Sequence, residues 1–250
     1  MSKPKLNRHS KFFHDRADEL RLLAVSLSSL YSVDEANLEP LKVAAKQLDI
    51  QGDGNATLNQ WGYQINNLTL PVGNIHNVNP AGIHAKISIN CECEFNVDDW
   101  NKTNCDPFTK YSFRVRVFGD YRGIKHSWGM HIDKEAREDV EEWHPLYHLH
   151  CFESRVDSPT VLIDTEQSKG TFLLNVPRLM HYPLDIVLGI GFCLMYFNKK
   201  EVFMDFYKND QQFPRLYKKS QDRILKPYLD SLAGVPGSVY LRKNLCPQVV

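Results

Sequence analysis

The chain has 250 residues, of which 42% are hydrophobic and 24% are charged, which are ordinary fractions for a globular protein. This composition excludes a disordered chain, a collagen and a coiled coil. The 30 basic and 30 acidic residues cancel, so a protein that binds nucleic acid or a membrane with its whole surface is excluded as well, although a local patch is not.

The ends and the cysteines of the chain indicate where it works. No apolar run of signal-peptide length follows the basic N-terminus, and the most hydrophobic stretch, residues 184–197, is shorter than the roughly 20 residues of a membrane span. The six cysteines are scattered, as in proteins whose thiols stay reduced. We therefore expect a cytoplasmic protein that has no membrane partner.

The first third of the chain is predicted to be helical. Apolar side chains recur at helical spacing from Phe13 to Tyr31, and Ser10 is a candidate cap for the start of that helix. Pro40 suits the first turn of a second helix, which carries Leu41 on its apolar face. Residues 1–60 are thus expected to form a helical layer.

The middle of the chain changes to the period of a β-strand. Every second residue from Ile83 to Phe95 is apolar, and residues 111–117 repeat the pattern. Shorter strands are expected at 125–133, 146–152, 160–163 and 171–176. Such clean alternation favours an antiparallel sheet within residues 61–176 that has one packed face.

The last third returns to the helical period. Pro183 opens a stretch that is apolar on all sides and therefore predicts a buried helix, and residues 214–232 form an amphipathic helix in which Pro227 is expected to cause a kink. Helices, a sheet and helices again predict the α+β class. We expect one domain over residues 1–250, with its C-terminal helical part at 177–250.

A histidine-rich segment provides the first candidate site. On a strand, His148 and His150 point to the same face, and so do His131 and Asp133 upstream. If these strands are neighbours, the four residues converge and can bind Zn²⁺ or Mn²⁺. Asp133 or Glu153 would then be the general base of a metal-dependent hydrolase, and a nuclease is one possibility.

The same pattern has a structural interpretation. Leu146 and Phe152 share the parity of His148 and His150, so this face can be buried. Imidazoles in such a place often bind backbone carbonyls within a polar core. The four residues are then not a metal site.

Two further groups of residues suggest contacts with anions. A basic and aromatic helix near the C-terminus carries Lys218, Lys219 and Arg223, which can bind the phosphates of a nucleic acid, unless they only form a solvated helix face. Arg178 and His181 precede the buried helix, whose N-terminus attracts anions. A structural ion pair of Arg178 is the alternative.

The order of motifs in the second half of the chain resembles a known pattern. The matching pieces are residues 130–133, the His-Pro-x-x-His-x-His segment at 144–150, the segments 177–178 and 182–185, and residues 220–229. They resemble uncharacterised bacterial proteins from mobile-element and defence-type gene neighbourhoods, over less than half of the chain. The resemblance implies a bacterial cytoplasmic setting, a role in defence against phages or plasmids, and protein partners encoded nearby, but no activity.

Three functional hypotheses follow. The first is a non-enzymatic binding or assembly component of a bacterial defence-type system, because the charge is neutral and the familiar catalytic motifs are missing. The second is the metal-dependent hydrolase described above. The third is a nucleic-acid-binding module that uses the C-terminal helix.

Overall fold

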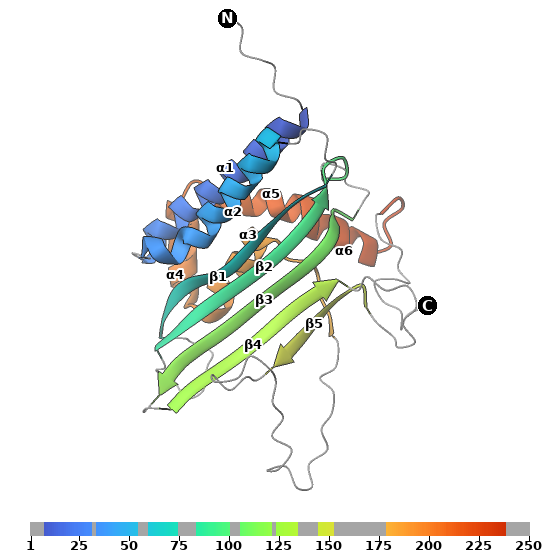
Figure 1. Cartoon of the computed structure of the whole chain (residues 1–250). Coiled ribbons are helices and arrows are strands. Elements are labelled where there is room, and N and C mark those ends of the chain that lie inside the picture. Colours follow the sequence, from blue (N-terminus) through green and yellow to red (C-terminus); the bar gives the residue numbers. More distant parts are fainter. Residues whose placement is uncertain are drawn as a thin grey trace, which may run out of the picture.

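The computed structural model describes residues 8–31, 34–54, 60–74, 84–100, 106–121, 124–134, 145–152 and 179–238. Two helices are followed by an antiparallel sheet and then by further helices, so the α+β class is confirmed (Figure 1). No helix in these ranges is both long and apolar enough to cross a membrane. The strands expected at 160–163 and 171–176 lie outside the described residues, as do Glu153 and Arg178.

Helices α1 (Arg8–Tyr31) and α2 (Glu35–Gly54) form an antiparallel pair whose apolar stripes face each other. Ser10 is buried inside α1 and therefore does not cap it, which corrects the prediction. The cap of α2 is Asp34, whose carboxylate accepts a hydrogen bond from the Ala36 N–H at 3.1 Å. Pro40 lies inside α2 and not in its first turn, again unlike the prediction.

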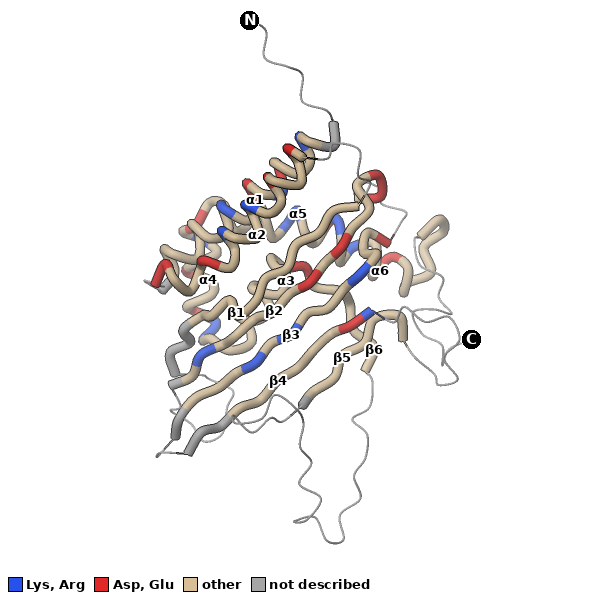
Figure 2. The backbone as a smooth tube through the Cα atoms, in the orientation of Figure 1, with Lys and Arg blue, Asp and Glu red and all other residues tan. Residues whose placement is uncertain are grey.

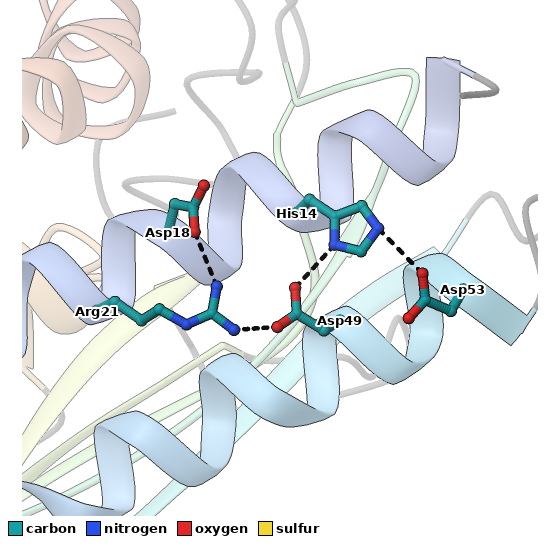
Figure 3. Close-up of polar contacts among 5 residues, drawn as sticks. All are labelled: His14, Asp18, Arg21, Asp49 and Asp53. Carbon is teal, nitrogen blue, oxygen red and sulfur yellow. Dashed lines mark hydrogen bonds and ion pairs between the residues drawn. The ribbon is translucent and has the colours of Figure 1, made fainter. Parts of the chain in front are cut away.

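Charged side chains join α1 to α2 on the outside of the pair (Figure 3). The His14 ring lies between two carboxylates of α2, with Nδ1 2.8 Å from Asp49 and Nε2 3.2 Å from Asp53. Arg21 also binds Asp49 and contacts Asp18 at 2.8 Å. The hydrogen bond that His14 donates to Asp49 raises the pKa of His14 despite partial burial, so the fold favours the protonated ring.

In the described part of the chain the sheet has six strands in sequential order, all antiparallel to their neighbours. The predicted strands appear as β2 to β5, and the sequence pattern missed β1 and the very short β6. The bounds are β1 (Gln60–Asn74), β2 (His84–Asn96), β3 (Phe108–Tyr121), β4 (Ile124–Lys134), β5 (Tyr147–Phe152) and β6 (Leu179–Met180).

Strand β1 escaped prediction because its alternation changes phase. The buried side chains in the first half of β1 are at odd positions: Trp61, Tyr63 and Ile65. In the second half they are at even positions: Leu68 and Leu70. The register shifts between Ile65 and Leu68, where Asn67 adopts a positive φ of 57°. A bulge of this kind moves side chains to the other face, so a search for strict alternation fails there.

One face of the sheet is covered by α3 (Ile186–Phe197) and the helices behind it (Figure 1). Gly189 provides the closest contact, since a Cβ there would lie 2.2 Å from the ring of Phe113 on β3. Two tyrosine hydroxyls of the sheet hold the start of α3. The hydroxyl of Tyr111 accepts a hydrogen bond from Leu184 N at 2.8 Å, and the hydroxyl of Tyr63 accepts one from Ile186 N at 3.3 Å. The predicted buried helix is therefore correct.

The amphipathic helix predicted at 214–232 is present as one continuous helical run of α5 (Phe213–Ser220), the π-helical turn η1 (Gln221–Leu225) and α6 (Lys226–Leu232). A separate helix, α4 (Lys200–Asn209), precedes it. Pro227 has no N–H to donate, and the wider π-helical turn lies directly before it. This turn directs Arg223 toward Trp100, with the guanidinium carbon 4.0 Å from the ring centroid.

Candidate functional site

The four residues of the predicted histidine site come together on the face of the sheet opposite α3. Strands β4 and β5 are neighbours, and their register places His131 across from His150 and Asp133 across from His148. Directly paired residues of an antiparallel sheet share a face. This face alternates with the one that carries the buried Met130 and Ile132.

The four side chains contact one another. His131 Nε2 lies 2.8 Å from Asp133 Oδ2, and the His131 ring stacks on that of His150 at 4.6 Å. The rings of His148 and His150 meet edge to face at 4.8 Å. His148 is only 4% exposed, and its Nδ1 lies 3.2 Å from the carbonyl oxygen of Pro145. Within the cluster, His148 is therefore buried, whereas His131 and His150 are half-exposed.

Asp133 carries the negative charge of this cluster. Burial favours the protonated acid, but hydrogen bonds from His131 and Ser112 and the nearby charge of Arg114 outweigh it, so the pKa of Asp133 is lowered. Its carboxylate therefore stays ionised near neutral pH. In this state it orients the ring of His131 through the contact with Nε2.

The arrangement does not resemble a metal site within the described part of the chain. No three His, Cys, Asp or Glu side chains there are placed to hold one ion. The donor atoms are instead turned toward each other, since His131 binds Asp133 and His148 faces a carbonyl. Zinc or manganese binding by His131, Asp133, His148 and His150 stays a prediction.

Two arginines extend the cluster onto β3. Arg114 lies directly across from His131, so Arg114, His131 and His150 form one row over three strands. Arg116 lies across from Gly129, which has no side chain to pair with it. Its Nε and Nη2 atoms are shielded from solvent and have no hydrogen-bond partner in the residues that the structure describes. Such nitrogens are costly unless an acceptor reaches them.

Charges on this face, which we call the open face, are separated along the strands (Figure 2). The basic Lys86, Arg114 and Arg116 lie on the stretch where residues 86–90 of β2 pair with residues 114–118 of β3. The acidic Glu92 and Glu94 follow further along β2, where Lys110 binds Glu92 at 2.6 Å. A net positive region therefore lies on a protein whose total formal charge is zero.

The basic residues predicted on the C-terminal helix are engaged within the protein. Lys218 pairs with Asp222, and Lys219 with Glu19 of α1. Arg223 turns inward over Trp100, and burial together with the charge of Arg16 lowers its pKa to about 10. Lys218 and Lys219 are exposed on the helix surface, whereas Arg223 is half-buried. Nucleic-acid binding at this helix remains untested.

The start of α3 offers few donors to an anion. Asp185 caps the helix by accepting from Leu188 N at 2.8 Å, and Ser220 donates to its other oxygen at 2.6 Å. The His181 ring stacks on Tyr182, and its Nδ1 lies 2.6 Å from the Tyr182 carbonyl oxygen. Burial lowers the pKa of His181, so the ring is neutral at pH 7. An anion would have to replace these bonds.

Sequence reasoning overlooked the residues of β3 as site residues. The pattern Arg114-Val115-Arg116 places two cations on the polar parity of a strand whose other parity is buried. The sequence therefore does contain a signal for a basic surface here, because two arginines lie on the same, uncovered face of one strand. Their position beside His131 could be known only from the strand order.

No protein-family model, curated protein or solved structure matches this chain. The resemblance to defence-type bacterial proteins, and the partners and setting that it implies, therefore remain predictions.

Proposed function

We propose that this protein acts by binding an anionic partner on the open face of its sheet, without catalysis of its own. The observation that supports this most directly is the row of Arg114, His131 and His150, next to the half-exposed Arg116. Guanidinium groups and protonated imidazoles bind phosphate and carboxylate oxygens through charge-assisted hydrogen bonds.

The contacts inside the site favour recognition over bond cleavage. Asp133 accepts a hydrogen bond from His131, and the His131 ring is stacked on its neighbour, so both are fixed in orientation. Fixed side chains lose little entropy when a partner binds. Arg114 is exposed and Arg116 is half-exposed, so an anion can reach Arg114 and the exposed part of the Arg116 side chain.

Inorganic tripolyphosphate is a suitable probe, because it presents several anionic oxygens and no other recognisable group. We expect calorimetry to show saturable binding that weakens about tenfold in Arg114→Gln, as the loss of one charged hydrogen bond implies. Lys226→Gln is the matched control, because Lys226 pairs with Asp230 on α6 away from the sheet. Absence of binding, or equal losses in both variants, would refute the proposal.

The metal-dependent hydrolase is the second candidate, and the convergence of His131, Asp133, His148 and His150 favours it. Small rotations of side chains would be needed before three donors face one point. Titration with Zn²⁺ and with Mn²⁺ tests it. Binding of one ion per chain that is lost in His150→Asn would support this function, and no rise in melting temperature with either ion would remove it.

A further inference from the structure

We infer that the anionic partner of the open face is a single-stranded nucleic acid, whose backbone follows a basic track and whose bases stack on Phe118. This inference rests on the proposed function and gives the partner its chemical class. The track runs diagonally from β2 to β5 and consists of Lys86, Arg116, Arg114, His131 and His150.

The track is continuous because of the strand register. Arg116 and Arg114 are two residues apart on β3, a separation of about 6.6 Å, and both side chains point to the same face. Lys86 lies on β2 at the outer end, and the row of His131 and His150 continues from Arg114 over two more strands of about 4.8 Å spacing. Successive phosphates of one extended strand can therefore meet successive arginine, lysine and histidine side chains.

Among the described residues, no acidic side chain lies between the basic residues of the track. The described residues on the open face between its cations are Ser88 and Asn90 of β2 and Gly129 of β4. Asp133, the nearest carboxylate, is already bound to His131. Glu92 and Glu94 follow Asn90 along β2, beyond the track, and would repel phosphates, so they limit its width on one side.

Phe118 supplies the aromatic platform. It is half-exposed on the open face, directly across from Lys86 and two residues from Arg116, whereas its neighbour Val117 is buried. A half-exposed aromatic ring between two cations has no role in the core of this sheet. Bases stack on such rings only when they are unpaired, which selects a single strand over a duplex.

The test uses fluorescence anisotropy with dye-labelled dT12, the U12 ribo-oligomer and a 12-base-pair duplex, each titrated with the full chain. We expect tighter binding of both single strands than of the duplex. Affinity for the single strands should fall as salt rises, and Arg116→Gln should reduce the slope of log K against log salt by about 0.7, the contribution of one phosphate contact. Phe118→Ala should weaken binding by about 5-fold to 150-fold, the range for loss of base stacking.

Matched variants separate this inference from its alternatives. Tyr196→Ala removes an exposed aromatic ring of α3, on the other side of the sheet, and should leave affinity unchanged. Lys218→Gln tests the C-terminal helix as an alternative binding surface and should also leave the affinity for single strands unchanged. A loss with Lys218→Gln but not Arg116→Gln would overturn the inference. Tripolyphosphate binding that depends on Arg114, together with no preference for single strands, would overturn it and leave the proposed function standing.

Discussion

The two faces of strand β3 show how one segment serves stability on one side and binding on the other. Phe113 is fully buried against Gly189 of α3, while Phe118 remains half-exposed beside Lys86. The polar groups differ in the same way. Tyr111 on the covered face reaches a backbone N–H, whereas two nitrogens of Arg116 on the open face reach no acceptor in the described part of the chain.

This comparison separates the residues of the covered face, which stabilise the fold, from those of the open face, which we propose bind a partner. Substitutions on the covered face should lower stability, and substitutions on the open face should lower binding. The predictions below test that division, beginning with the largest expected effect.

Phe113→Ala should lower the free energy of unfolding by about 4 kcal/mol, because it leaves a cavity beneath α3. Phe118→Ala removes the same ring from the open face of the same strand and should cost less than about 1 kcal/mol. Urea denaturation of the three proteins measures both values. Similar costs for the two substitutions would show that both faces are equally packed.

Asp185→Ala should cost about 2 kcal/mol, because Leu188 N and the Ser220 hydroxyl both lose their acceptor at the start of α3. Asp185→Asn keeps an acceptor oxygen and removes a carboxyl whose pKa burial has raised. We therefore expect it to stay within about 1 kcal/mol of the wild type. Equal losses for both variants would mean that the charge, and not the hydrogen bonds, holds this helix.

The stabilisation from His14 should depend on pH. Its pKa is raised in the fold by Asp49, so the protonated ring contributes fully below the unfolded pKa of about 6.5 and is lost as pH rises through the higher folded value. The difference between wild type and His14→Gln should be at most about 1 kcal/mol at pH 5.5, because the ring is partly exposed, and smaller at pH 8.5. Denaturation at both pH values checks this, and a constant difference would contradict it.

Arg114→Gln should change the free energy of unfolding by less than about 0.5 kcal/mol, because the side chain is exposed. The same variant is expected to weaken anion binding about tenfold. Thermal unfolding without ligand measures the first effect. A large loss of stability would show that Arg114 contributes to the fold, which would contradict its assignment as a binding residue alone.

Much of the fold could be predicted from periodicity alone. The strands around Ile87 and Val115 and the buried helix after Pro183 follow from their apolar spacing, which also gives the α+β class. Strand β1 could not be predicted, because the bulge at Asn67 breaks the alternation. The exit of Arg223 from the basic helix face depends on a π-helical turn that spacing does not reveal.

The candidate site was predictable in part. Same-face pairing of His148 with His150, and of His131 with Asp133, follows from strand geometry, and their meeting required β4 and β5 to be neighbours. The part played by Arg114 could not be foreseen, since it depends on the register between β3 and β4. Register is fixed by packing over the whole sheet, which no local pattern contains.

Histidine footprinting tests the central claim, that the open face is the binding surface, most directly. Diethyl pyrocarbonate modifies accessible imidazoles, and mass spectrometry gives the rate for each one with and without tripolyphosphate. The account predicts that bound tripolyphosphate slows modification of His131 and His150 and leaves that of His14, on the distant helix pair, unchanged. Unchanged rates at His131 and His150 under saturating ligand, or protection of His181 instead, would contradict it.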